Sequence, residues 1–222
     1  MADHDFDGAP APLTWEQIRV ADRPFAPACE RNKGPILEVL RRLFADATDV
    51  LEIGSGTGQH AVWFAAGLPH LTWRTSDLVS NHAGINVWID EAGLANLERP
   101  LALDVAGRPW PIASAGGVFS ANTAHYMHWS KVEAMFGGVA DLLPPGARFA
   151  LYGPFARDGR HTSASNAAFD RTLRAHDPGF GVRDRRDLER LATGVAMQLE
   201  EDVAMPSNNR ILVWRKAPDR LR

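Results

Sequence analysis

A predicted buried strand that ends in a carboxylate and three evenly spaced glycines is the part of this chain best suited to hold a ligand. It runs from Val50 to His60 and reads VLEIGSGTGQH, with glycines at 54, 56 and 58. Glycine lets the backbone turn sharply and approach a ligand more closely than any Cβ would permit. The amides behind the glycines open a predicted helix, whose amino-terminal end favours electronegative groups. The loop is therefore a candidate nucleoside-cofactor site, although glycine also punctuates ordinary connections.

The spacing of the glycines discriminates among cofactors. A dinucleotide fingerprint, G-x-G-x-x-G, requires glycine at position 59, where the chain has Gln59, and this disfavours an NAD-dependent oxidoreductase. A P-loop requires Gly-Lys followed by Ser or Thr, which occurs nowhere in the sequence. The stretch resembles motif I of the class I S-adenosylmethionine (SAM) methyltransferases, E/D-x-G-x-G-x-G. By this resemblance the loop residues that would hold SAM are Glu52, Gly54, Ser55, Gly56 and Gly58.

Two further acidic residues close the next two apolar runs. Asp77 follows the run 71–76, about 20 residues beyond the glycines, the offset at which an acid meets ribose in nucleotide folds. Asp is also a favoured helix cap, so Asp77 could begin the next helix, or do both. Asp104 closes the run 100–103, where the class I pattern places an acidic or polar residue against the adenine amino group. The predicted cofactor contacts are completed by Leu78, Val105, which would lie against the adenine ring, and Asn122.

Two histidines follow the fourth predicted strand, in the segment 120–129. Methyl transfer from a sulfonium is an in-line displacement, so a protein supplies alignment, desolvation and, for a protonated nucleophile, a base. A neutral imidazole accepts a proton near pH 7, which makes His125 and His128 the candidate bases. Tyr126, grouped with them as a candidate catalytic residue, and Trp129 could form apolar walls or cation–π contacts. Both histidines could instead be packing or capping residues, and zinc is disfavoured because no cysteine or H-E-x-x-H lies nearby.

Absences in the same segment narrow the acceptor. The Asn/Asp-Pro-Pro-aromatic tetrapeptide of many adenine and glutamine N-methyltransferases is missing, and residues 122–125 read Asn-Thr-Ala-His. Cytosine C5 chemistry needs a thiolate here, but the only cysteine is Cys29. The acidic cluster of metal-assisted catechol methylation is absent as well. By elimination, a small molecule with an O, N or S nucleophile is the expected acceptor, and no metal is expected.

Composition fits one α/β domain without nucleic-acid or membrane partners. The 222 residues are 45% hydrophobic and 23% charged, enough to cover both faces of a sheet. A formal net charge of -3 gives no reason to expect a polyanionic partner. A single cysteine excludes an internal disulfide, and neither a leader nor a bilayer-length apolar stretch occurs, so a cytoplasmic location is expected. The sequence does not specify an oligomeric state.

Hydrophobic periodicity predicts strictly alternating strands and helices in the first two thirds of the chain. An amphipathic helix is expected over 36–44, with Pro35 in its first turn. The expected strands are 50–53, 71–76, 100–103, 117–121 and 148–152, and the expected helices are 59–66, 86–92 and 131–143. This alternation is typical of a parallel sheet with helices on both faces.

The last third departs from this alternation. A polar excursion over 154–166 precedes helices around 167–175 and 185–193, and the mixed charges of 183–187 indicate a solvated helix start. Strands 198–205 and 211–214 flank Pro-Ser-Asn-Asn, which predicts an antiparallel hairpin. The whole matches the Rossmann-like class I methyltransferase fold, a seven-stranded, mostly parallel sheet of order 3-2-1-4-5-7-6. The turn at 207–209 should then project from the same edge as the cofactor.

Separated motifs extend the resemblance beyond the general class. They are ERNK at 30–33, residues 52–60, ANTAHYM at 121–127, SNAAFD at 165–170, GVRD at 181–184 and MPSNN at 205–209. Together they resemble the methyltransferase-like family catalogued as domain of unknown function 938, over roughly residues 24–216. By this resemblance Glu30, Arg31 and Asn32 would lie near the pocket, with Asn32 or Arg31 reaching the methionine carboxylate or a substrate group. Helix capping by Glu30 and Lys33 is the alternative.

The resemblance implies a SAM-dependent methyltransferase with S-adenosylhomocysteine as its product. The expected substrate-binding residues are Trp129, Asn208, Asn209 and Trp15, although the two asparagines could simply shape the hairpin turn. Residues 1–23 are expected to form a flexible tail or a lid, to which Trp15 would belong, and residues 24–222 a single methyltransferase domain. The alternative function is a SAM-binding sensor or partner subunit without transfer activity.

Overall fold

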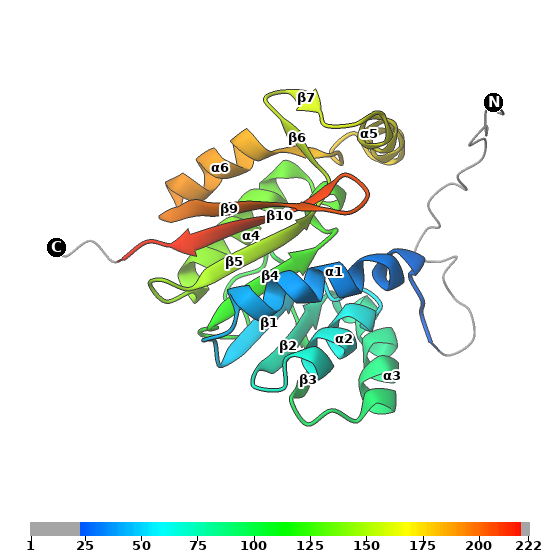
Figure 1. The fold of residues 1–222 in the computed structure, drawn as a ribbon, viewed down its shortest axis with the longest axis vertical. Coiled ribbons are helices and arrows are strands. Elements are labelled where there is room, and N and C mark those ends of the chain that lie inside the picture. The colour runs from blue at the N-terminus through cyan, green and yellow to red at the C-terminus, as the bar shows by residue number, and fades with distance from the viewer. Residues whose placement is uncertain (1–22, 219–222) are drawn as a thin grey trace.

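A seven-stranded sheet runs through residues 23–218, the part of the chain that the computed structural model describes (Figure 1). Its strands are β1 (Asp49–Ile53), β2 (Thr72–Asp77), β3 (Leu97–Ala102), β4 (Gly117–Ala121), β5 (Arg148–Gly153), β9 (Met197–Met205) and β10 (Asn209–Lys216). The order is β3-β2-β1-β4-β5-β10-β9, and β10 alone runs antiparallel to its neighbours. Since β9 and β10 are the sixth and seventh strands of this sheet, the predicted order is confirmed.

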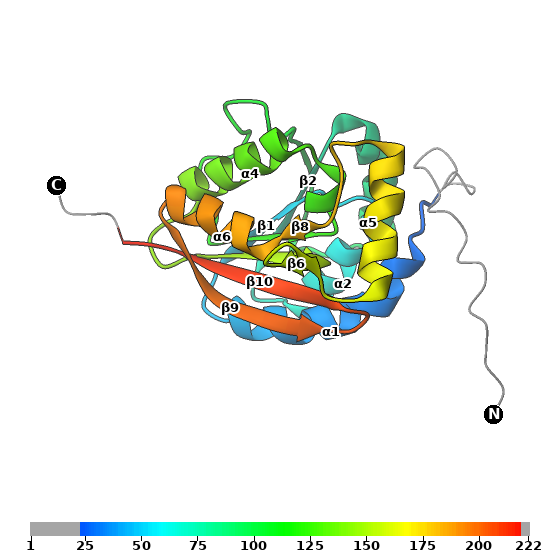
Figure 2. The ribbon, with the colours of Figure 1, turned by 90° about the horizontal axis from the view of Figure 1, so that it is seen from above.

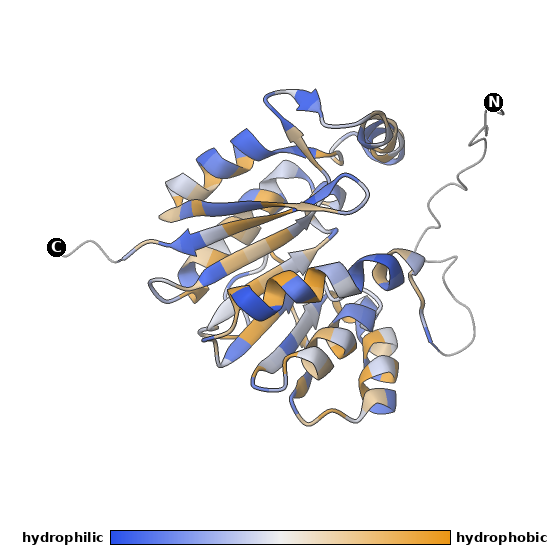
Figure 3. Cartoon of the chain, viewed as in Figure 1, coloured by the Kyte–Doolittle hydropathy of each residue, from blue (hydrophilic) through white to orange (hydrophobic). Residues whose placement is uncertain are grey.

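Helices cover both faces of the sheet, as Figure 2 shows from above. One face carries α1 (Pro27–Leu43), α2 (Gln59–Gly67) and α3 (His82–Ala92), and the other carries α4 (Trp129–Leu142) and α6 (Arg185–Gly194). Residues 50–53 of β1 are therefore all buried, the pattern of a strand covered on both sides. Figure 3 shows hydrophobic colours gathered on the middle strands. The α/β Rossmann-like methyltransferase fold predicted from the sequence is confirmed.

Helix α1 begins much earlier than the apolar period indicated. It starts at Pro27, whose fixed φ suits a first helical position, and Pro35 lies inside the helix instead of in its first turn. The prediction was wrong because the first two turns are mostly polar and only the later ones bury an apolar stripe. These polar turns bring residues 30–33 to the carboxyl edge of the sheet, beside the start of α2.

The segment predicted as a polar excursion contains two strands. With a third they form a small second sheet, which consists of β6 (Phe155–Arg157), β7 (Arg160–His161) and β8 (Arg183–Asp184). Helix α5 (Ala164–His176) packs beside it around a separate apolar cluster that includes Leu173 and Val182. Strands of two or three residues are too short for a recognisable period, so the sequence did not predict them. We call residues 154–184 the insert; its helix α5 stands beside the carboxyl ends of the central strands (Figures 1 and 2).

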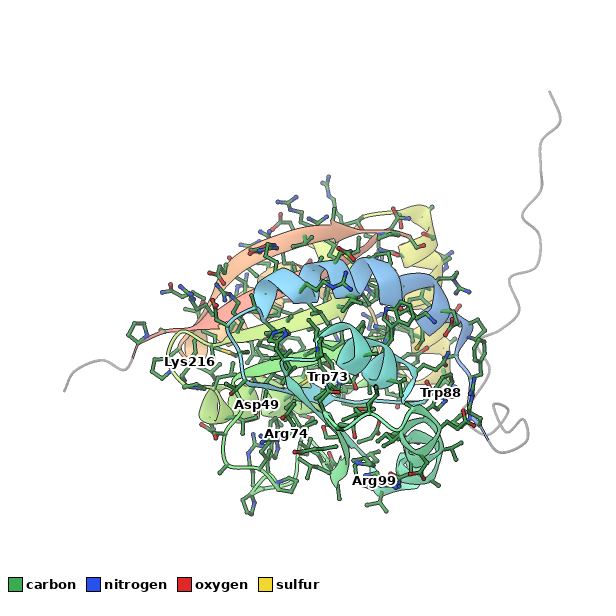
Figure 4. All side chains as sticks on the ribbon, turned by 60° about the horizontal axis from the view of Figure 1, so that its bottom comes forward. Asp49, Trp73, Arg74, Trp88, Arg99 and Lys216 are labelled. Carbon is green, nitrogen blue, oxygen red and sulfur yellow. The ribbon has the colours of Figure 1, made fainter. Side chains whose placement is uncertain are left out.

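An ion pair joins two strands at the amino-terminal edge of the sheet. Nη1 of Arg74 lies 2.8 Å from Oδ2 of Asp49, the first residue of β1, and thereby joins β1 to β2 (Figure 4). No helix within residues 23–218 combines the length and the apolar character needed to cross a bilayer. The residues with candidate chemistry thus meet at the other edge, where the parallel strands end.

Two adjacent glycines in α4 give matched tests of the packing. Gly138 lies beneath the indole of Trp110, and a Cβ there would come within 2.2–2.5 Å of ring carbons. A Cβ on Gly137 would meet nothing closer than 3.7 Å. Gly138 also lines a surface hollow of about 490 Å³ between the 108–113 loop and α4.

We predict opposite effects on the free energy of unfolding. Gly138→Ala should lower it by about 1–3 kcal/mol, because the indole must move out of its packed position. Gly137→Ala should raise it by about 0.5–1 kcal/mol through helix propensity alone. Urea denaturation with unchanged m-values measures both, and equal effects of the two substitutions would contradict the packing described for Trp110.

Candidate functional site

The glycine loop between β1 and α2 has a backbone that only glycine adopts without strain. The φ angles of Gly54, Gly56 and Gly58 are +74°, +59° and +91°. A Cβ on Gly54 would stand 2.5 Å from Cγ2 of Thr123, the residue that follows the end of β4 by two positions. The amides of Gly54 and Ser55 donate to the carbonyl of Ser76 in β2, at 2.9 and 3.0 Å. The loop is therefore packed between the ends of β2 and β4.

Asp77, the last residue of β2, is joined directly to this loop. Its Oδ2 accepts the N–H of Gly56 at 2.7 Å, and its Oδ1 accepts the amide of Leu78 at 2.7 Å and Nδ2 of Asn81 at 2.8 Å. It is not a helix cap, because the short 3₁₀ helix Val79–Asn81 begins after Leu78 and α3 begins after Asn81, neither with a side-chain capping hydrogen bond. Leu78 is 47% exposed, so an apolar side chain lies in solvent next to the acid. The backbone of the glycine loop and the residues after β2 thus fix the carboxylate of Asp77 at the end of the strand.

Asp104 lies after β3 and is held by a residue that the sequence analysis did not consider. Its carboxylate accepts the amide of Ala106 at 3.1 Å and lies 3.1 and 3.2 Å from Nζ of Lys131 in α4. The Ala106 amide, and then Lys131, hold the pKa of Asp104 below its usual range. Its neighbour Val105 is buried in the core against α4 and so has little surface left for a ligand.

Glu52 lies beneath the glycine loop with 1% of its surface exposed. Its Oε2 accepts the indole N–H of Trp73 at 3.2 Å. Burial raises its pKa to about 7, and the charge of Asp77 acts in the same direction, while hydrogen bonds from Trp73 and Ser55 oppose the rise. Glu52 thus supports the loop from inside the sheet.

Gln59 stands at the position where a dinucleotide fingerprint would have its third glycine, and its side chain is hydrogen-bonded there. Its Oε1 accepts the amide of Ala26 and the hydroxyl of Thr57, and its Nε2 donates to Glu30 at 3.0 Å. Gln59 is 2% exposed and ties the start of α1 to the glycine loop. The sequence analysis used this residue only as the absence of glycine, because its partners come from a distant segment.

The motif residues of α1 have different surroundings. Asn32 is buried, and its Oδ1 lies 2.7 Å from Nε2 of His60. Burial lowers the pKa of His60 to about 4, so the ring is neutral at pH 7 and donates to the amide oxygen. Burial also raises the pKa of Tyr152, near the end of β5, while hydrogen bonds with the side chains of Asn32 and Asn209 oppose the rise. Arg31 is exposed and forms no ion pair within residues 23–218, so it is the α1 residue better placed to reach a ligand.

The structure separates the two candidate bases. His125, 4% exposed, packs against Tyr126 and Phe169 with ring centroids 4.6 and 5.2 Å away. Its Nδ1 lies 3.7 Å from where a Cβ on Gly153 would stand, so the ring lies against the end of β5. Burial, and then the charge of Arg183, lowers the pKa of His125 to about 3. His128 is exposed, and its Nε2 lies 2.9 Å from Asp177.

The predicted substrate residues are distributed around this edge. Trp129 opens α4, donates its indole N–H to Glu133 at 2.9 Å and packs against the core. Nδ2 of Asn208 donates to Ser165 of α5 at 3.3 Å, while Asn209 donates to the carbonyl of Pro206 within the turn at 3.3 Å.

Backbone pairing places the turn at 207–209 where it was predicted. Arg210 pairs with Gly153 at the end of β5, so the turn lies at the carboxyl edge. Asn122, with a φ of +57°, donates its amide to the carbonyl of Tyr152 and closes β4 against β5. Trp15 lies outside the described residues. Within those residues no three His, Cys, Asp or Glu side chains gather to hold a metal ion.

Residues 23–216 match the family described as protein of unknown function (DUF938). An O-methyltransferase family protein from Burkholderia thailandensis is 18% identical with a TM-score of 0.76, and the match covers 87% of this chain and 58% of that one. Mitomycin 7-O-methyltransferase MmcR is 16% identical with a TM-score of 0.74, covering 86% of this chain and 54% of that one.

A third solved structure was determined with ligands. It is an O-methyltransferase from neocarzinostatin biosynthesis in complex with SAM and 2-hydroxy-5-methyl naphthoic acid, 14% identical with a TM-score of 0.66. The match covers 83% of this chain and 56% of that one. The chain therefore spans less than two thirds of the length of these structures, and the likeness at such identity is one of fold.

The buried carboxyl of Glu52 gives a testable pH dependence. Its pKa is about 7 in the folded chain against an ordinary value of 4.5, so the folded state keeps a proton that the unfolded chain loses as pH rises through this window. We expect this group to lower the free energy of unfolding by up to about 3 kcal/mol between pH 4.5 and pH 8. Glu52→Gln, which stays neutral, should lack this decrease.

Denaturant unfolding at several pH values measures the difference between the two proteins. The titrations of His60 and His125 cancel in that difference, because both proteins contain them. Glu38→Gln, at an exposed site on α1, is the control and should follow the parent protein. Equal pH slopes for the parent and Glu52→Gln would show that the carboxyl is not held neutral.

Proposed function

The chain belongs to the DUF938 family of proteins of unknown function, and we propose that it is a SAM-dependent methyltransferase acting on a small molecule. The observation that carries the proposal is the hydrogen bond between Gly56 and Asp77. It joins the glycine loop to the acid at the end of β2, at the edge where ligands bind in sheets of this topology. The solved structures of the same fold, named as SAM-dependent or O-methyltransferases, support it.

The residues present fit SAM. Asp77 accepts three hydrogen bonds, and a carboxylate has about four acceptor sites, so one remains for a ribose hydroxyl. The exposed side chain of Leu78 offers an apolar surface to the adenine ring, and Asp104 offers an acceptor to the adenine amino group. Arg31 is a cation for the methionine carboxylate. Bound SAM supplies an activated methyl group, so the chain itself must align the acceptor and exclude water.

The acceptor is an O, N or S nucleophile, and the surroundings of His125 favour an oxygen or a sulfur. Methylation of an amine leaves a cation on the acceptor, and the nearby guanidinium of Arg183 opposes that charge. A hydroxyl or thiol instead reacts as an anion, which the same guanidinium stabilises. The aromatic rings of Tyr126 and Phe169 lie beside His125, and Phe180 packs against Tyr126. These partly exposed rings suit an apolar acceptor body.

Calorimetric titration with SAM and with S-adenosylhomocysteine tests the cofactor. We predict that Asp77→Asn weakens binding of both by at least about tenfold, because a hydrogen bond to a charged acceptor contributes about 1.5–3 kcal/mol. Asp90→Asn, at an exposed acid on α3, should bind as the parent does. Absence of saturable heat with the parent protein would remove the proposed function and the sensor alternative together.

Turnover separates the enzyme from a SAM-binding sensor. With a pool of small metabolites, the parent should convert SAM to S-adenosylhomocysteine, whereas a sensor would bind tightly without product. We predict that His125→Asn lowers product formation by about 100-fold with the SAM dissociation constant changed less than about twofold. His128→Asn should have a smaller effect, because His128 is exposed and paired with Asp177. A larger effect at His128 would contradict the assignment of His125.

A further inference from the structure

The loop that carries His125 is held from outside the main sheet by the end of the insert. The amide of Gly181 donates to the carbonyl of His125 at 3.0 Å. The guanidinium of Arg183 donates through Nε to the carbonyl of Ala124 at 3.0 Å and through Nη2 to the carbonyl of Met127. The carbonyl acceptors of Ala124 and Met127 flank the two aromatic residues at 125 and 126. One arginine therefore spans the turn on which the proposed base lies.

Arg183 does this without a carboxylate partner. Within residues 23–218 no Asp or Glu oxygen lies within 4.0 Å of it, and its third hydrogen bond, at 2.7 Å, is to the carbonyl of Gly179. The side chain is only partly exposed, and desolvation lowers its pKa. A partly buried charge is costly unless it is hydrogen-bonded, so this guanidinium depends on the carbonyls that it binds. We therefore expect that the loop 124–127 loses its geometry when the contacts of Arg183 are lost.

A rigid frame holds Arg183 on the insert side. It is the first residue of β8 and pairs in parallel with Phe155 of β6, and β6 follows β5 directly. The amide of the preceding residue, Val182, donates to the buried carboxylate of Asp170 in α5 at 2.7 Å. Gly181 has a φ of +146°, and a Cβ there would stand 2.6–2.8 Å from Arg174 and Asp170. The backbone that presents the guanidinium is thus fixed by α5 and by β6.

We propose that Arg183 is a positioning residue of the methyl-transfer site: its guanidinium binds the carbonyls of Ala124 and Met127 and thereby holds His125 against the end of β5. The meaning of this role rests on the proposed function. The geometry itself does not, because it concerns only two segments of this chain. The same contacts make the insert and the loop after β4 one unit at the edge where the acceptor would bind.

Two substitutions separate the hydrogen bonds from the charge. Arg183→Met keeps much of the length of the side chain but removes both, and Arg183→Lys keeps the charge but replaces the planar fork with a single ammonium group. Arg171→Ala, which removes one exposed positive charge from α5, is the control. Far-UV circular dichroism and urea m-values establish that each variant is folded.

Two readouts need no acceptor. Amide hydrogen exchange reports the order of residues 124–127, and NMR titration of the His125 ring, identified by comparison with His125→Asn, reports its pKa. In Arg183→Met we expect exchange of that loop to accelerate at least about tenfold and the pKa of His125 to rise toward its ordinary value, because a positive charge near the ring is lost. In Arg183→Lys the exchange should also accelerate, because one ammonium cannot reproduce the two bonds, while the pKa should rise less. Arg171→Ala should change neither.

Folded Arg183→Met with unchanged exchange of 124–127 and an unchanged His125 pKa would overturn the proposal. Accelerated exchange throughout the insert and the sheet, with no preference for 124–127, would assign Arg183 a general structural role and would overturn it as well. SAM titration keeps the two hypotheses apart. The Arg183 variants should bind SAM within about twofold of the parent, and a parent that binds no SAM would defeat the proposed function while the loop measurements still decide the role of Arg183.

Discussion

The left-handed backbone of the glycine loop is the constraint on which the rest of this edge depends. Because Gly54 has no Cβ, the methyl group of Thr123 can pack onto the loop, and the ends of β1 and β4 come together. Because Gly56 turns its N–H toward β2, its backbone amide holds the carboxylate of Asp77 in place. Because Gly58 has no Cβ, the start of α2 can pack closely against α3: a Cβ there would stand only 3.1 Å from the Cα of Ile85. A side chain at Gly54 or Gly58 would separate elements that the candidate site needs close together, and one at Gly56 would strain its left-handed backbone.

The main fold could be predicted from the sequence because its signals are local. Strands β1, β4 and β5 are largely apolar runs, and the Pro-Ser-Asn-Asn turn marks the hairpin that ends the sheet. The start of α1 and the strands of the insert were not predictable in the same way. The first turns of α1 are polar because they face the glycine loop and α2 through Gln59 and His60, and β7 has only two residues, both exposed. Their conformations are determined by partners far away in the sequence.

The residues of the candidate site also fall into those with a local sequence signal and those determined by distant partners. The acids that end β2 and β3 could be identified because a carboxylate after an apolar run has a recognisable position. Lys131 and Arg183 could not, because each acts through a partner that only the folded chain brings near it. The mixed-charge run 183–187 was interpreted as a solvated helix start, and this was wrong for Arg183, whose three hydrogen bonds all go to carbonyls. The helix itself begins two residues later than that guanidinium, at Arg185.

The electrostatics of this edge restrict what His125 can do. Burial moves Glu52, His60 and His125 toward their neutral forms, with pKa values of about 7, 4 and 3. A base whose conjugate acid has a pKa of about 3 removes a proton from a hydroxyl of ordinary acidity only at a large cost in free energy. If His125 is the base of the proposed methyltransferase, the acceptor must therefore be acidic itself, or its anion must be stabilised as it forms.

The charge of Arg183 adds to the effect of burial in keeping the imidazole of His125 neutral, and in the proposed reaction it would favour such an anion. In the proposed reaction, an anionic acceptor near His125 would offset the guanidinium and raise the pKa of His125, so that the histidine would become a better proton acceptor once the acceptor is in place. His125 would then be a weak base in the empty site and a stronger base in the occupied site. It would therefore take up few protons in the absence of substrate. For the proposed enzyme, the positive charge of Arg183 thus favours acidic hydroxyl or thiol acceptors over amines. The same guanidinium holds the loop 124–127.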